Sequence, residues 1–98
     1  RAMVGTLAYM APEQALGDRR AVGPAADVYG LAALLFHART GRAPFVGDSA
    51  LGVLTAVLQD APPSARALAP DTSPGLDALL AAALAKSPAE RPPTAEAF

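Results

Sequence analysis

The sequence predicts an all-α fold in which about five helices pack around one buried central helix. Alanine fills 25 of the 98 positions, aromatic residues make up 5% and tryptophan is absent. Such a core suits closely packed helices better than a sheet of β-branched residues. The ten prolines are too many for uninterrupted helix and indicate rigid turns between helices. Residues 1–98 are long enough for at most one small domain.

The first helix is expected to begin at Pro12. Residues 1–10 contain Gly5 and Thr6 and lack helical periodicity, so we expect an extended or looped segment there. Proline is well tolerated in a first helical turn, where its missing N–H has no partner to lose. Gly17 can end this helix after one to two turns.

Residues 25–40 give the strongest helical pattern in the chain. Apolar side chains fall on more than one face of this helix, which is typical of a helix buried in the middle of a domain. Gly41 is a suitable C-terminal stop, and the proline at 44 prevents continuation. We expect the large apolar side chains of this helix to belong to the core: Leu31, Leu34, Leu35 and Phe36.

A third helix is expected after Asp48 or Ser49, either of which can cap it. One face of this helix carries an apolar stripe, formed by Leu51, Leu54, Val57 and Leu58. Residues 61–72 contain three prolines and are predicted to form an ordered loop.

A fourth helix is expected to begin with Ser73 as its cap and Pro74 in its first turn. Its apolar face is followed by Lys86, a cation suited to the negative end of the helix dipole, so the helix is predicted to close there. Residues 90–93 then form a turn, and Thr94 is positioned to cap a fifth helical segment.

Composition excludes several classes of partner. The formal net charge is −1 and the pI is about 5.7, so no polybasic field attracts nucleic acid or an anionic membrane. The longest uncharged apolar stretch, residues 28–36, is far shorter than a bilayer span. Cysteine is absent, which removes disulfides and thiolate metal sites and fits a reducing compartment. We therefore expect a cytoplasmic protein.

Four motifs occur in order along almost the whole chain. They are Gly-Thr-Leu-Ala-Tyr-Met-Ala-Pro-Glu-Gln at 5–14, Asp-Val-Tyr-Gly-Leu at 27–31, Thr-Gly-Arg-Ala-Pro-Phe at 40–45 and Ala-Lys-Ser-Pro-Ala-Glu-Arg-Pro at 85–92. In this order and spacing they resemble the bacterial, Hanks-type branch of the serine/threonine protein kinases. The resemblance covers the C-terminal lobe from the end of the activation loop onward. It implies a partial kinase domain without the N-terminal lobe and catalytic loop.

The resemblance assigns the first motif to the substrate side of the kinase. Gly5 and Thr6 would end the activation loop, and Thr6 would hydrogen-bond the catalytic Asp and Lys beside the accepting hydroxyl. Tyr9 and Met10 would help to shape the pocket for the substrate residue that follows the acceptor. Taken alone, Thr6 would be interpreted as an ordinary loop hydroxyl.

The resemblance also implies two structural roles. Glu13 would form the family's buried ion pair with Arg91, whereas the residues alone also allow two solvated charges. Asp27, at the start of the central helix, would tie the backbone of the catalytic loop to that helix. Its simpler interpretation is a carboxylate that stabilises the helix start.

The residues that perform phosphoryl transfer are missing from this sequence. The family needs a glycine-rich loop, a lysine for the phosphates, a catalytic Asp with a nearby Asn, and an Asp-Phe-Gly motif. The chain has no Gly-x-Gly, no Asn and no Asp-Phe-Gly, and its one lysine is Lys86. His37-Ala38-Arg39 is not the His-Arg-Asp loop, because it lies within a helix and no Asp follows. His37 is instead expected on a helix surface or in lobe packing.

We therefore expect a fragment of a kinase, called here the parent kinase, that transfers the γ-phosphate of ATP to Ser or Thr of protein substrates. The fragment would carry no catalytic residue and no metal ligand, so ATP and Mg²⁺ would bind only to the intact parent. Sequence is expected upstream, because the chain starts at Arg1 and lacks an initiating Met. Any membrane anchor of the parent would also lie outside this chain. The alternative is a non-catalytic helical interaction module or a pseudokinase remnant.

Overall fold

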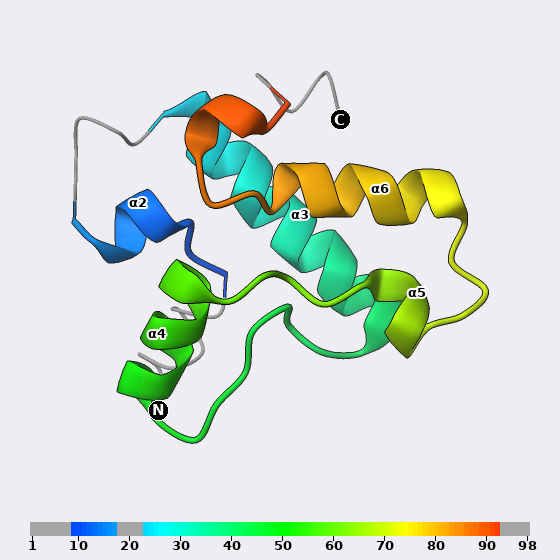
Figure 1. The fold of residues 1–98 in the computed structure, drawn as a ribbon, viewed down its shortest axis with the longest axis horizontal. Helices are drawn as coiled ribbons and strands as arrows, with labels where there is room; N and C mark the ends of the chain where they lie inside the picture. The colour runs from blue at the N-terminus through cyan, green and yellow to red at the C-terminus, as the bar shows by residue number, and fades with distance from the viewer. Residues whose placement is uncertain (1–8, 18–22, 93–98) are drawn as a thin grey trace.

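A computed structural model of the chain describes residues 9–17 and 23–92 (Figure 1). This part is helical and contains no strand, which confirms the predicted all-α class. Its elements are α2 (Pro12–Ala15), α3 (Pro24–Thr40), α4 (Ala50–Gln59), α5 (Ala65–Leu68), α6 (Pro74–Ala83) and the short 3-10 helix η1 (Pro88–Glu90). The predicted cap at Thr94 lies outside the described residues. Within them, no helix is both long and apolar enough to cross a membrane.

Helix α3 runs through the middle of the fold and packs against α5, α6 and η1 (Figure 1). It ends at Gly41, whose φ of 85° places it in the left-handed region and whose N–H donates to the carbonyl of His37 at 2.8 Å. Its buried face supplies most of the main core, with Ala11, Ala65 and the end of α6 completing it. The α3 side chains in that core are Ala26, Val28, Tyr29, Ala32, Ala33 and Phe36.

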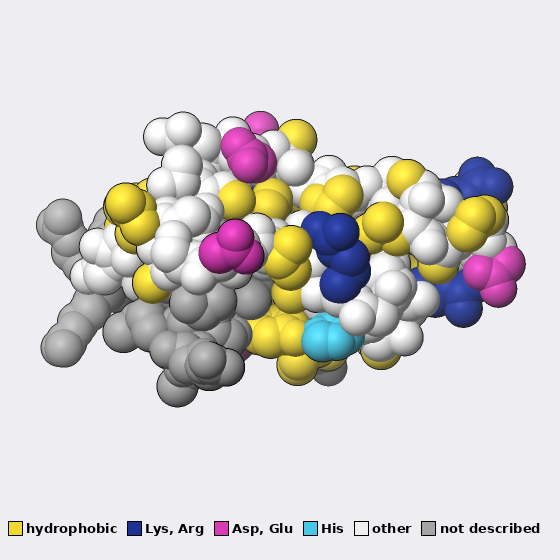
Figure 2. Space-filling view, turned by 90° about the horizontal axis from the view of Figure 1, so that it is seen from below, with side chains coloured by type: hydrophobic (Ala, Val, Ile, Leu, Met, Phe, Trp, Pro, Cys, Tyr) yellow, Lys and Arg dark blue, Asp and Glu magenta, His cyan; other side chains and the backbone are white. Residues whose placement is uncertain are grey.

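The prediction that α3 is buried on every face is wrong. Phe36 is fully buried, but Leu31, Leu34 and Leu35 are exposed, Leu34 to 58%. The reason is that α5, α6 and η1 cover the face that carries Phe36 and leave the leucines without a packed helix among the described residues. Figure 2 shows hydrophobic side chains on the surface beside the histidine, drawn in cyan.

Helix α4 belongs to a second, smaller core that it forms with Phe45. Ser49 is its cap, since the hydroxyl accepts the N–H of Gly52 at 3.1 Å. The predicted apolar stripe is wrong in part, because Leu51 is 72% exposed while Val53 and Val57 are fully buried. These two valines lie one turn apart and face Phe45, so the covered face is rotated away from Leu51.

The predicted loop at 61–72 contains a short helix, α5, which was not expected. The carboxylate of Asp77, in the first turn of α6, accepts the N–H of Ala65 at 2.9 Å and the hydroxyl of Ser64 at 3.1 Å. The backbone N–H of Ala65, at the start of α5, is thus paired with a side chain twelve residues downstream. Ser64 is also a local cap, since its hydroxyl accepts the N–H of Ala67 at 3.4 Å, so the sequence carried a signal for α5 that was missed.

Helix α6 begins as predicted, with Ser73 accepting the N–H of Leu76 at 3.1 Å and Pro74 in the first turn. It ends at Ala83 with Leu84 as its C-cap, close to Lys86 as predicted, but the expected contact of that lysine with the end of α6 is wrong. The ammonium of Lys86 instead lies 3.5 Å from the carbonyl of Ala56, in the last turn of α4, and 4.1 Å from the ring centre of Phe45. Burial lowers the pKa of Lys86. This lysine therefore stabilises the end of a different helix from the one expected.

Two glycines give a matched test of the backbone. Gly75 lies in α6, and a Cβ there would meet nothing within 4 Å, whereas Gly41 holds a positive φ. We expect Gly75→Ala to raise the free energy of unfolding of the full-length protein by about 0.5–1 kcal/mol, since alanine favours helix. Gly41→Ala should lower that free energy by about 1–2 kcal/mol. Equilibrium urea unfolding measures both; equal effects of the two changes would contradict the assignment.

Candidate functional site

The guanidinium of Arg91 is the most highly connected group in the described structure. It is 4% exposed, and each of its five N–H groups has an acceptor. Two donate to the carboxylate of Glu13, at 2.7 and 2.9 Å. The other three donate to the backbone carbonyls of Ala25, Ala85 and Lys86. Arg91 thus joins α2, the start of α3 and the segment between α6 and η1.

Glu13 lies in the first turn of α2 and is also buried, at 6% exposure. Burial alone would raise the pKa of its carboxyl group. The hydrogen bonds from Arg91, a backbone N–H and the positive charge of Arg91 outweigh burial and hold the pKa below its usual value. Glu13 and Arg91, which the resemblance paired, therefore lie in direct bidentate contact as charged groups.

Tyr29 lies under this ion pair. The Cζ atom of Arg91 is 5.0 Å from the centre of the Tyr29 ring, within range of a cation–π contact. The phenol is fully buried, and its hydroxyl has no hydrogen-bond partner in the structure as described. Burial raises the pKa of Tyr29 to about 12. The hydroxyl therefore stays protonated at any physiological pH.

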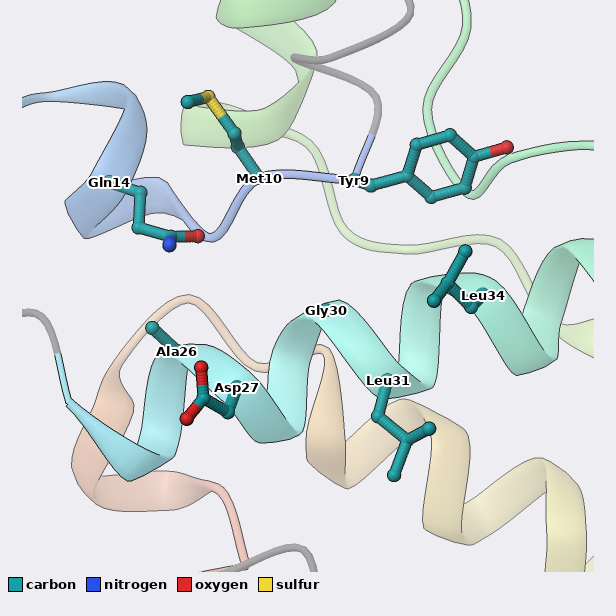
Figure 3. Close-up of a pocket in the computed structure, with 8 residues that line it drawn as sticks. All are labelled: Tyr9, Met10, Gln14, Ala26, Asp27, Gly30, Leu31 and Leu34. Atoms are coloured by element: carbon teal, nitrogen blue, oxygen red, sulfur yellow. The ribbon is translucent and has the colours of Figure 1, made fainter.

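An open groove of about 450 Å³ runs between the segment before α2 and the N-terminal half of α3 (Figure 3). The described residues that line it come from the segment before α2, from α2 itself and from α3: Tyr9, Met10, Gln14, Ala26, Asp27, Gly30, Leu31 and Leu34. Its walls are largely apolar, and among the described residues that line it Asp27 is the one that carries a charge. A groove of this kind suits a peptide segment that brings apolar side chains and backbone N–H groups.

Asp27 lies in the first turn of α3 and is exposed. No hydrogen bond from another described residue reaches its carboxylate. The position leaves its oxygens able to accept N–H groups from a segment lying in the groove (Figure 3).

The side chains of Tyr9 and Met10, just before α2, pack in different places. Tyr9 packs against the main core and Met10 against the second core around Phe45. The N–H of Ala11 donates to the side-chain oxygen of Gln14 at 3.0 Å, which fixes the entry into the helix. Gly5 and Thr6, the other two predicted substrate-side residues, lie outside the described residues.

His37 has a contact that the sequence did not reveal. Its Nδ1 atom is hydrogen-bonded to the hydroxyl of Tyr9, and the two rings stack with centroids 5.9 Å apart and planes 4° apart. The residues are 28 positions apart in the chain, so only a fold that lays residues 9–11 along α3 brings them together. No cluster of acidic, histidine or cysteine side chains suited to a metal ion occurs within 9–17 and 23–92.

Comparison with known proteins identifies the family. The chain is 45% identical over 96 residues to the serine/threonine-protein kinase PksC of Streptomyces coelicolor, an alignment that takes in 98% of the chain. It is 42% identical over 96 residues to the kinase pkn3 of Myxococcus xanthus and 43% identical over 95 residues to PknB of Mycolicibacterium smegmatis. The chain belongs to the bacterial serine/threonine protein kinases. No family model matches it.

The chain corresponds to a small part of each relative. It spans 17% of the length of PksC and of pkn3, and 15% of PknB. With its helical fold, the chain is a fragment of the C-terminal lobe of such a kinase.

The ion pair gives a direct test by mutation. Glu13→Ala leaves the guanidinium of Arg91 buried without its counter-charge, and Arg91→Ala does the same to Glu13. We expect each change to lower the free energy of unfolding of the full-length protein by about 3–5 kcal/mol. Urea unfolding measures the loss, with the exposed Glu90→Ala and Arg66→Ala as controls that should stay within about 0.5 kcal/mol. Losses no larger than those of the controls would contradict the role of the pair.

The lowered pKa of Glu13 predicts a pH dependence. Its carboxyl group has a folded-state pKa below the ordinary 4.5, so its contribution to stability is complete above pH 4.5. The contribution is lost as the pH falls through the folded-state value. Unfolding free energies measured from neutral to acidic pH should converge for the wild-type protein and Glu13→Gln at the acidic end. A gap between them that stays constant with pH would disprove this assignment.

Proposed function

We propose that the chain is the substrate-side and scaffolding part of a kinase that transfers the γ-phosphate of ATP to Ser and Thr of protein substrates. One observation carries the proposal: three kinase-like motifs, far apart in the chain, meet around one site. Tyr9 and Met10 of the first motif and Asp27 of the second line the groove. Arg91 of the fourth motif holds Glu13, at the start of α2, against Ala25, at the start of α3.

The chemical step needs groups from outside this chain. In phosphoryl transfer the bond from the γ-phosphorus to the bridging oxygen of ATP breaks, a bond to the substrate hydroxyl oxygen forms, and a catalytic Asp takes the hydroxyl proton. ATP with Mg²⁺ supplies the phosphoryl group and the cation that neutralises its charge. Lys86, the single lysine, lies against Phe45 and α4, away from the groove. We infer that the fragment alone is inactive.

The part of the groove beside Asp27 has a natural occupant in this proposal, the catalytic loop of the same kinase, which leaves the Tyr9 end to the substrate. The carboxylate of Asp27 lies at the first turn of α3, where it can accept backbone N–H groups of such a loop. Leu31 and Leu34 offer an exposed apolar surface beside it. The loop would thereby be fixed next to Tyr9 and Met10, on the side where the substrate lies.

The exposed leucines of α3 favour one alternative, a non-catalytic interaction module or pseudokinase remnant that binds a partner through this face. The coding sequence upstream of Arg1 separates the two readings. A continuous frame with His-Arg-Asp, Asn and Asp-Phe-Gly supports the enzyme, and a start codon with nothing kinase-like before it supports the module. In either case the net charge of −1 argues for protein partners and against nucleic acid or membrane.

The activity is tested by phosphate incorporation from labelled ATP in the presence of Mg²⁺. We expect the full-length protein to phosphorylate peptides containing Ser or Thr and to leave matched Tyr peptides unlabelled. The chain 1–98 alone should incorporate no label. Labelling of Tyr peptides by the full-length protein, or activity of the isolated chain, would refute the proposal.

The isolated chain should also unfold without a sharp transition. Each exposed leucine on α3 lacks roughly 1.5–3 kcal/mol of the stabilisation that burial would give it. We expect a broad, weakly cooperative thermal unfolding of residues 1–98 followed by circular dichroism. A sharp transition at high temperature would show that the fragment is a stable domain in its own right.

A further inference from the structure

One line of α3 residues runs beneath Tyr9. Gly30, Leu34 and His37 are spaced four and three residues apart, so they lie on one side of the helix over about 10 Å. A Cβ at Gly30 would lie 3.9 Å from the carbonyl oxygen of Tyr9, which puts the Tyr9 backbone over the start of this line. The Tyr9 hydroxyl reaches His37 at its far end.

Tyr9 therefore contacts α3 through its hydroxyl at His37, and its backbone lies above Gly30 two turns earlier. Figure 3 shows its ring extending along the helix above Leu34, away from Gln14 and Asp27. The hydroxyl contact is supported by the nearly parallel stacking of the two rings. In the tautomer with its proton on Nε2, His37 accepts at Nδ1 a hydrogen bond that the Tyr9 hydroxyl donates.

Tyr9 and His37 differ in their relation to the groove. Tyr9 and Leu34 line it, whereas His37 does not. His37 is exposed, and among residues 9–17 and 23–92 its side chain bonds and stacks with Tyr9 only. Any effect of His37 on the groove must therefore pass through the position of the Tyr9 ring.

We propose that His37 is a positioning residue that fixes the Tyr9 ring as a wall of the substrate site and so sets selectivity for the side chain that follows the phospho-acceptor. This inference rests on the proposed kinase function, in which Tyr9 and Met10 shape the pocket for that side chain. Without His37, the ring loses the hydrogen bond and the stacking that hold its far end, and the pocket loses its defined width. The discrimination between a large and a small side chain at this position then falls.

The test uses the full-length protein and two peptides that differ only in Leu or Ala after the acceptor Ser. The measured quantity is the ratio of their kcat/KM values. Tyr9→Phe keeps the ring and removes the hydroxyl, while His37→Phe keeps the stacking and removes the acceptor. We expect each to reduce the ratio about threefold to tenfold, the range for loss of one hydrogen bond. The change should appear in KM, with kcat within about twofold of wild type.

Three further variants sharpen the result. The double variant Tyr9→Phe with His37→Phe should lose no more than the larger single loss, since both remove the same contact. His37→Asn, whose amide oxygen can take the place of Nδ1, should restore part of the ratio. Arg66→Ala, an exposed change on α5 far from the groove lining, should leave the ratio unchanged. Unchanged ratios in both single variants, or losses that add in the double variant, would overturn the proposal.

A second readout is independent of catalysis. If the wild-type protein phosphorylates no peptide, the proposed function fails, and amide hydrogen exchange decides the role of His37. Tyr9→Phe and His37→Phe should each speed exchange in the peptide containing Tyr9 and Met10 about threefold to tenfold, with α6 unaffected. Exchange equal to wild type in that peptide would show that the contact does not hold Tyr9.

Discussion

The contact between Arg91 and Glu13 is the constraint on which the rest of the fold depends. It joins residues 78 positions apart and closes almost the entire chain into one loop. Closing so long a loop costs entropy, and a bidentate buried pair offsets that cost only with good geometry. Here the geometry is complete, because the guanidinium also bonds the carbonyls of Ala25, Ala85 and Lys86. This contact holds α2 against the start of α3, and so it sets how the two sides of the groove lie relative to each other.

The two cores support different parts of the molecule, the helical scaffold and the proposed substrate side. The main core packs α3 against α5 and α6 and thereby fixes where Asp27, Gly30 and Leu34 lie along α3. The second core, around Phe45, supports α4 and receives Met10. Lys86 connects them, since it follows α6 and contacts both the Phe45 ring and α4. Tyr9 packs against the main core and its neighbour Met10 against the second, so a change in either core alters the position of this pair.

The sequence predicted the features whose cause is local. Ser49, Ser73 and Gly41 bound their helices through contacts within a few residues, and each lies where expected. The covered face of α4 was missed because it depends on the distant Phe45. Helix α5 was missed although Ser64 caps it locally, with the distant Asp77 bonding the same turn. At the site, the family resemblance paired Glu13 with Arg91, whereas nothing near His37 in the sequence indicates Tyr9. The burial of Leu31, Leu34 and Leu35 was predicted wrongly, because apolar pattern alone does not say which neighbours cover a helix.

The full set of acceptors around Arg91 also limits what can replace it. A lysine would keep the positive charge, but its ammonium has three N–H donors, against the five acceptors that the guanidinium satisfies. At least two oxygens would be stranded in a buried space that water enters poorly, and the cation–π contact with Tyr29 would change its shape. The planar guanidinium of arginine supplies an N–H donor for each of the five acceptors. Lysine therefore cannot replace Arg91 without leaving some of these oxygens unpaired.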